Sequence, residues 1–193
     1  MKKLLFLGLL TVVVLGLTLR GTFGYFNDSE VSAGSTFTAW DPVSILADGF
    51  EGSPWDVNWD DNGASSWEPS GKKVHSGQWS AYFKGAKPAD TARLTSDDLD
   101  TSGARGVTIS FWFRPDLKKS DRLLVQAYNG TSYVTLYDLA EYPTYRKGRW
   151  GYFSLTLTDP QFLRSNFRLR FDASGVTNKK SKFYLDDVLV EVY

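Results

Sequence analysis

Apolar and polar residues alternate with a period of two along most of the chain after residue 40. Successive side chains of a β-strand point to opposite faces, so this pattern predicts half-buried strands. No segment after residue 40 has the apolar spacing of a helix. The expected strands lie near residues 35–40, 44–50, 55–60, 73–84, 91–95, 107–114, 122–128, 132–138, 150–158, 167–173 and 182–192.

Turn-forming residues separate these runs, at Asn129-Gly130, Asp159-Pro160 and Ser174-Gly175. An Asn-Gly step between two alternating runs is typical of a tight hairpin. About nine to eleven antiparallel strands without repeats or heptads predict an all-β fold, a single jelly-roll β-sandwich. No Pro-rich linker divides the chain, so we expect one domain over residues 43–193.

The first 24 residues have the features of a secretory signal peptide. Lys2 and Lys3 precede an apolar run over residues 4–19. As a helix this run spans ~24 Å, short of a ~30 Å hydrocarbon core. The small residues Thr22 and Gly24 stand at positions −3 and −1 of a cut after Gly24. We therefore expect a secreted, extracellular or cell-surface protein. The alternative is an uncleaved anchor, which would be the protein's sole contact with a membrane.

Residues 21–42, GTFGYFNDSEVSAGSTFTAWDP, combine a small-residue cleavage site, an aromatic pair, an Asn-Asp step and a Thr-Phe-Thr-Ala strand. In this order the features resemble the TasA/camelysin family of secreted biofilm-fibre subunits. The resemblance implies self-association into an extracellular fibre, pilus or surface matrix. Residues 25–42 would then be an N-terminal extension that donates a strand to the sheet of a neighbouring subunit. The side chains that such a strand would bury are Val31, Phe37 and Ala39.

Four further motifs follow one another in a recognisable order. A Phe-Glu step opens the domain, a His-Ser-Gly turn and a Phe-Trp-Phe strand follow, and an Asp-Asp-Val step closes it. This order resembles the jelly-roll modules of carbohydrate-binding and MAM-like type. The motifs lie at residues 48–52, 75–77, 109–113 and 183–188.

The same resemblance implies a structural Ca²⁺ ion shared by the opening Glu and the closing Asp. Here these residues are Glu51 and Asp186, with Asp48 and Asp187 as further candidate ligands. Calcium takes six to eight oxygen ligands, and the turn after His75 would supply carbonyl groups. The alternative is that these acids are solvated or paired with Lys.

The strand faces that point away from the core collect Tyr, Trp and Arg. If several of these strands share one sheet, the outer surface suits sugar rings, which stack on aromatic side chains. It suits a protein interface equally well, because such interfaces are enriched in the same residues. A third alternative is cover by a loop or by the N-terminal segment. The candidate binding residues are Trp112, Arg114, Tyr128, Tyr133, Trp150 and Tyr152.

The segment from Trp55 to Trp67 holds three Trp residues and several acids. The segment could bind a metal, bind a sugar or form a loop that is packed by its own aromatic residues. We prefer the third interpretation.

Composition excludes several classes of function. The chain has no Cys, which rules out disulfides and Cys-ligated zinc. Lys plus Arg and Asp plus Glu both number 22, a balance that disfavours nucleic-acid binding. His75 is the only histidine, so histidine-rich metal catalysis is excluded. The Glu-x-Asp-x-Glu arrangement of jelly-roll glucanases is absent, and we expect no enzyme.

Two functions therefore remain. The preferred one is a secreted structural fibre subunit that assembles through its N-terminal strand. The alternative is a secreted carbohydrate-binding module or adhesin that is stabilised by Ca²⁺ and has polysaccharide as its partner.

Overall fold

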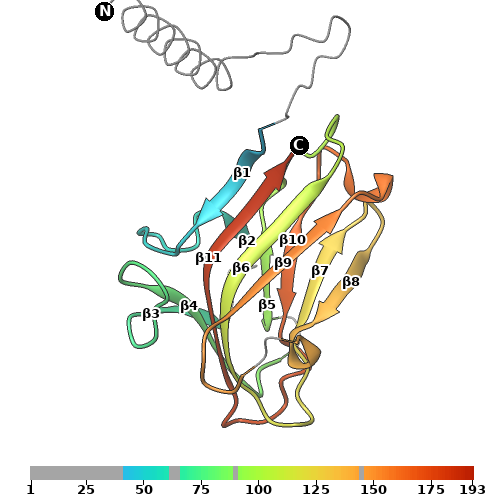
Figure 1. Ribbon diagram of the computed structural model, residues 1–193. Coiled ribbons are helices and arrows are strands. Elements are labelled where there is room, and N and C mark those ends of the chain that lie inside the picture. The colour runs from blue at the N-terminus through green and yellow to red at the C-terminus, as the bar shows by residue number, and fades with distance from the viewer. Residues whose placement is uncertain (1–40, 61–65, 89–90, 144–145) are drawn as a thin grey trace, which may run out of the picture. The chain divides into compact units, whose positions relative to one another are not determined.

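The computed structural model describes residues 41–60, 66–88, 91–143 and 146–193. They form a sandwich of two antiparallel sheets, which confirms the predicted all-β fold (Figure 1). Two 3-10 turns, η1 (Leu139–Glu141) and η2 (Pro160–Phe162), interrupt the strands. The strands are β1 (Val43–Asp48), β2 (Trp59–Asp60), β3 (Trp67–Ser70), β4 (Ser80–Lys84), β5 (Arg93–Ser96), β6 (Val107–Asp116), β7 (Leu124–Tyr128), β8 (Tyr133–Asp138), β9 (Gly151–Leu157), β10 (Leu169–Asp172) and β11 (Lys182–Val192).

The long strand β11 organises the six-stranded sheet. Five of its strands follow the order β3-β4-β11-β6-β9, and the sixth, β1, also pairs with β11. The first half of β11 pairs with β4 and its second half with β1, while β6 pairs along its other edge. The register with β6 shifts between Asp186 and Leu189, which marks a β-bulge. The five-stranded sheet has the order β2-β5-β10-β7-β8.

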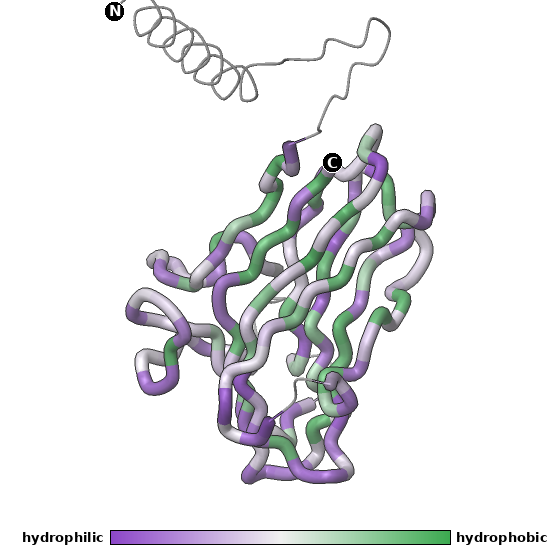
Figure 2. The backbone as a smooth tube through the Cα atoms, viewed as in Figure 1, coloured by the Kyte–Doolittle hydropathy of each residue, from purple (hydrophilic) through white to green (hydrophobic). Residues whose placement is uncertain are grey.

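Phenylalanine rings join the two sheets. Phe111 of β6 stacks on Phe153 of β9 at 4.6 Å between ring centroids and meets Phe171 of β10 edge-on at 5.0 Å. Apolar and polar positions alternate along the strands (Figure 2). The predicted inward residues are buried, apart from the partly buried Leu155: Val107, Ile109, Phe111, Phe113, Phe153, Leu157, Phe167, Leu169 and Phe171.

The strand expected over residues 73–84 is shorter in the structure. Residues 71–79 form a turn, and β4 begins only at Ser80. The pattern analysis also missed β3, because Pro69 interrupts a run of only four residues. Trp67 in β3 and Trp59 in β2 are buried in the core, which agrees with packing for these two members of the Trp-rich segment.

The hairpin predicted at Asn129-Gly130 joins β7 and β8. Asn129 Oδ1 accepts hydrogen bonds from the N–H groups of Thr131 and Ser132, and Gly130 has a φ of 93°. The register of this hairpin shifts between Val125 and Gln126. Because of the shift Tyr137 turns toward Tyr142 and Phe153, whereas strict alternation with Tyr133 and Thr135 would point it outward.

The expected signal peptide, residues 1–24, lies outside the described residues, as does almost all of the N-terminal extension, residues 25–42. The same holds for its proposed assembly residues Val31, Phe37 and Ala39. Within the part of the chain that is described, no helix is long and apolar enough to cross a membrane.

Candidate functional site

The outer face of the six-stranded sheet carries a row of large side chains. The strand register aligns Glu68 of β3, Tyr82 of β4, Tyr184 of β11 and Arg114 of β6 across four strands. The two tyrosine rings lie 4.8 Å apart, as cross-strand neighbours do. One row further along, Trp112 of β6 pairs with Tyr152 of the edge strand β9.

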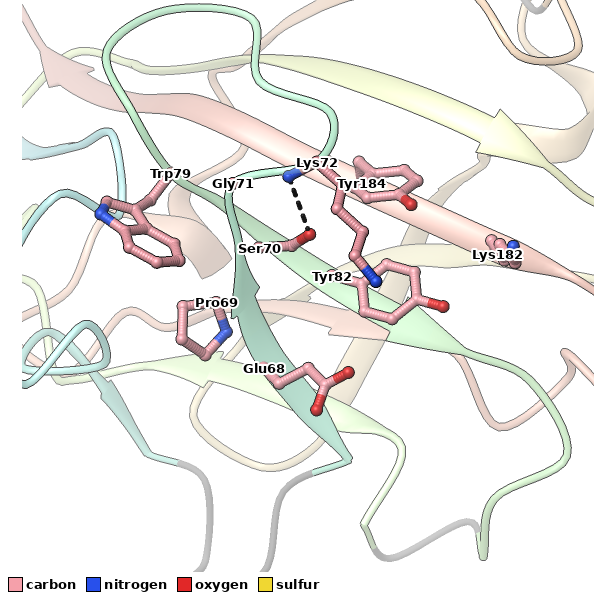
Figure 3. A pocket seen from close by; sticks show the side chains of 9 residues that line it. All are labelled: Glu68, Pro69, Ser70, Gly71, Lys72, Trp79, Tyr82, Lys182 and Tyr184. Atoms are coloured by element: carbon pink, nitrogen blue, oxygen red, sulfur yellow. Dashed lines mark hydrogen bonds between the residues drawn. The ribbon is translucent and has the colours of Figure 1, made fainter.

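A pocket of about 340 Å³ opens beside this row (Figure 3). Tyr82 and Tyr184 line it together with Trp79, Glu68 and Lys72. Burial raises the pKa of both tyrosines, and for Tyr82 the neighbouring Tyr184 and Glu68 raise it further. Both hydroxyls therefore stay protonated at neutral pH and can donate hydrogen bonds.

Two further aromatic side chains on this side of the sheet are exposed. Trp79, on the pocket wall, is 43% exposed, and Tyr152, on β9, is 44% exposed. Tyr152 also contacts Trp112, with 5.2 Å between ring centroids. We call the surface formed by Glu68, Trp79, Tyr82, Arg114, Tyr152 and Tyr184 the aromatic row.

His75 covers part of Trp112. Its imidazole stacks on the indole with 3.9 Å between centroids and 13° between planes. Trp150 meets the same imidazole edge-on at 5.5 Å. Trp112 and Trp150, both predicted to contact a ligand, thus help to seat the turn of residues 75–79 on the sheet, and one ring face of Trp112 is taken by His75.

Buried Asp186 holds the start of this turn. Its Oδ2 accepts hydrogen bonds from the backbone N–H groups of His75 (2.7 Å) and Ser76 (3.3 Å), and its Oδ1 accepts from the N–H of Asp187 (2.9 Å). Burial raises the pKa of Asp186 to about 6; the His75 N–H bond opposes this shift and the Asp187 charge adds to it.

Glu51 holds the end of the turn. Its Oε1 accepts hydrogen bonds from the N–H groups of Gln78 (2.8 Å) and Trp79 (3.0 Å). Gly77, which directly precedes Gln78, has a φ of 63°, and a Cβ atom there would collide with the Glu51 carboxylate. The sequence places a glycine here because both the backbone angle and the available space require one.

Asp187, at the β11 bulge, completes the contacts. Its carboxylate is 2.6 Å from His75 Nδ1 and 2.5 Å from Ser76 Oγ. The Asp48 carboxylate has other partners. It accepts hydrogen bonds from the N–H of Phe50, the Asn58 amide and the Trp59 indole. The structure therefore brings Glu51, Asp186 and Asp187 around one turn and gives Asp48 separate partners.

The predicted calcium site stays a prediction. Among the described residues, no three or more His, Cys, Asp or Glu side chains are grouped so that they could hold a metal ion. Both Asp186 oxygens and Glu51 Oε1 face N–H donors, and such donors would repel a cation placed beside these oxygens.

The remaining predicted binding residues, Tyr128 and Tyr133, lie on the other sheet. They are partners in the β7–β8 hairpin, 5.3 Å apart, on the outer face of the five-stranded sheet. The six candidates are therefore divided between two faces, because β6 and β9 belong to one sheet and β7 and β8 to the other.

Four residues of the aromatic row were not among the binding residues predicted from the sequence: Glu68, Trp79, Tyr82 and Tyr184. The alternation of Tyr82 with the core residues Ala81 and Phe83, and of Tyr184 with Phe183 and Leu185, already carried the signal. Only the pairing of β4 with β11 makes these tyrosines neighbours.

No family model and no curated protein matches this sequence. Solved structures do match in fold. The C-terminal family 22 carbohydrate-binding module of Clostridium thermocellum Xyn10B aligns with a TM-score of 0.56 at 16% identity and covers 77% of this chain and 94% of that chain. The K3 adhesin domain of Lys-gingipain from Porphyromonas gingivalis aligns with a TM-score of 0.55 at 20% identity, over 78% and 99%.

A third match combines a CBM22 module with a GH10 module of Clostridium thermocellum xylanase 10B, in complex with xylohexaose. It has a TM-score of 0.53 and 13% identity, and covers 78% of this chain and 28% of that one. None of these structures supports the resemblance to fibre subunits. At these identities the matches assign a fold: this chain has the jelly-roll sandwich found in carbohydrate-binding modules.

Proposed function

We propose that this chain is an extracellular carbohydrate-binding module that holds a polysaccharide along the aromatic row. The observation that carries the proposal is the position of Trp79 and Tyr152. Trp79 is exposed on the pocket wall and Tyr152 is exposed on the edge strand β9, and the same surface also offers two tyrosine hydroxyls, a carboxylate and a guanidinium. Exposed rings stack on the C–H faces of sugars, and the polar groups between them fix orientation.

The shared fold supports this function over fibre assembly. Several matched solved structures are named as carbohydrate-binding or xylan-binding domains, and one holds xylohexaose. Shared fold alone does not decide function, so the proposal rests on the aromatic row and uses the comparison as support. Secretion through the segment of residues 1–24 would deliver such a module to polysaccharides outside the cell.

Isothermal titration of the purified chain with soluble xylan and β-glucan oligosaccharides tests the proposal. We expect Trp79→Ala and Tyr152→Ala each to weaken binding at least tenfold, because each removes a stacking surface without disturbing the buried core. Ser154→Ala is the matched control, since Ser154 is exposed on the same strand as Tyr152 and presents no ring. If both alanine variants bind the polysaccharide as the unmodified chain does, the aromatic row is not the site.

A further inference from the structure

The outer face of the five-stranded sheet carries a different chemistry. The register aligns Thr95 of β5, Arg170 of β10, Gln126 of β7 and Thr135 of β8 in one row. Arg170 therefore lies near the middle of the sheet. Its guanidinium lies over the Tyr133 ring, with the guanidinium carbon 3.2 Å from the ring centroid.

Two neighbouring arginines already have acidic partners. Arg93 forms an ion pair with Asp172 at 3.2 Å, and Arg168 forms one with Asp98. Arg170 forms no ion pair with any carboxylate whose side chain is described. Its one hydrogen bond within that set runs from Nε to Thr95 Oγ1, at 3.0 Å.

The charge on Arg170 is poorly compensated. Burial lowers the pKa of Arg170, and the nearby Arg93 lowers it further, although Tyr133 and Asp172 oppose these effects. A guanidinium carries five N–H donors in a planar fork, so most of the Arg170 donors remain available to a ligand.

Two buried polar atoms beside Arg170 are further candidates to bind a ligand. The Gln126 side chain is 9% exposed; its amide nitrogen donates to Thr135 Oγ1, but Oε1 has no hydrogen-bond partner in the described part of the chain. The buried Tyr133 hydroxyl likewise has no hydrogen bond of normal geometry there, although it interacts with the Arg168 and Arg170 guanidinium groups. Leaving such groups unpaired costs ~1–3 kcal/mol each, so a ligand that pairs them gains binding energy.

We propose that Arg170, Tyr133 and Gln126 form a second binding site, which takes the carboxylate of a uronic acid residue in an acidic polysaccharide. Arg170 and the Tyr133 hydroxyl donate to the carboxylate, and Gln126 Oε1 accepts from a sugar hydroxyl beside it. The planar carboxylate matches the guanidinium fork and the sugar hydroxyl beside it satisfies Gln126, whereas a free inorganic anion offers only acceptor oxygens, which Gln126 Oε1 would repel. The site is independent of the aromatic row, because it lies on the other sheet.

Titration of the full chain in 150 mM salt with three oligosaccharides of equal length tests the proposal: oligogalacturonate, its fully methyl-esterified form and a sulfated neutral oligosaccharide. We expect binding of oligogalacturonate only. Equal binding of the methyl ester would show that the carboxylate is not recognised, and equal binding of the sulfated chain would show a general anion site; either result overturns the proposal.

Substitutions locate the site. We expect Arg170→Gln to weaken oligogalacturonate binding at least tenfold, while Arg149→Gln, at an exposed arginine outside both proposed sites, changes it less than twofold. Tyr133→Phe removes one hydroxyl and keeps the ring beneath Arg170, so it should fold normally even if Arg170→Gln does not, and should weaken binding severalfold. If Arg170→Gln does not fold, Arg170→Lys takes its place. Binding that is unchanged both in Tyr133→Phe and in the folded Arg170 variant overturns the assignment.

Trp79→Ala and Tyr152→Ala separate this site from the function proposed above. Both variants should bind oligogalacturonate as the unmodified chain does, whatever they do to neutral polysaccharides. Loss of oligogalacturonate binding in these two variants would assign the acidic ligand to the aromatic row and would overturn the second site.

Discussion

At the scale of single residues, carboxylates, both buried and exposed, act as acceptors for backbone N–H groups of distant loops. Asp186 and Glu51 do so for the turn of residues 75–79, as described above. Asp121 does so for the loops that precede β7 and β11. It accepts hydrogen bonds from the N–H groups of Lys118 (2.8 Å), Thr177 (3.0 Å) and Asn178 (3.2 Å) and from the Ser181 hydroxyl.

Asp121→Asn should lower the free energy of unfolding by roughly 2–3 kcal/mol at pH 7, because the amide group places donors against donors in a buried site. Burial alone would raise the pKa of Asp121, but its four hydrogen bonds outweigh burial and lower it below 3.8. A depressed folded-state pKa stabilises the protein above pH 3.8, and this contribution disappears as the pH falls through the folded-state value.

Urea unfolding of the unmodified chain and of Asp121→Asn at pH 7 and near pH 3 measures this contribution. The difference between the two proteins should shrink at the lower pH. Asp116→Asn is the control, because Asp116 is half-exposed in an ion pair with Lys147 and should change stability by less than about 0.5 kcal/mol. A difference that stays constant with pH would contradict the role given to the Asp121 charge.

At the scale of elements, the bulge in β11 explains how the turn of residues 75–79 lies against the sheet. Asp187 adopts a φ of 48° there, and its carboxylate reaches the side chains of His75 and Ser76. Asp186 and Glu51 bind backbone N–H groups on the two ends of the same turn. Trp79, the last residue of this turn, lies on the wall of the pocket. Bulges often redirect side chains next to functional sites, and this one connects the carboxylates with the aromatic row.

Because N–H donors already hold these carboxylates, we expect removal of divalent metal to leave the fold intact. The melting temperature in EDTA should match that in millimolar Ca²⁺ within about 2 °C, since a ligand that binds only the folded state raises it measurably. Differential scanning calorimetry makes the comparison, with Mg²⁺ as the control for ionic strength. A rise of several degrees with Ca²⁺ alone, abolished by Asp186→Asn, would support the calcium site predicted from sequence.

At the scale of the whole molecule, the sandwich has two outer faces with distinct chemistry. One has exposed rings around a pocket, and the other has an arginine without an acidic partner among the described side chains. Under the two proposals above, one molecule would hold a neutral polysaccharide on one side and an acidic one on the other. A module of this kind would link two components of an extracellular matrix without forming a fibre itself.

The described core lies between Leu46 and Val190, so the chain from residue 41 onward should fold without the preceding segment. We expect a 41–193 chain to melt within about 2 °C of a 25–193 chain and to bind the same oligosaccharides. Size-exclusion chromatography and negative-stain microscopy of both chains provide the second readout. Filaments from the longer chain alone would support the strand donation predicted from the N-terminal resemblance.

The sequence by itself determined most of the strand positions in the described residues, the inward residues of β6, β9 and β10 and the hairpin at Asn129, because alternation and turn chemistry are local properties. The resemblance to carbohydrate-binding and MAM-like modules also implied that Glu51, His75 and the Asp186–Asp187 pair belong together. Only the tertiary structure decided that Trp112 and Tyr133 face opposite sides of the molecule and that Tyr82 and Tyr184 are neighbours. These facts depend on strand order and register, which arise from contacts between segments up to about one hundred residues apart.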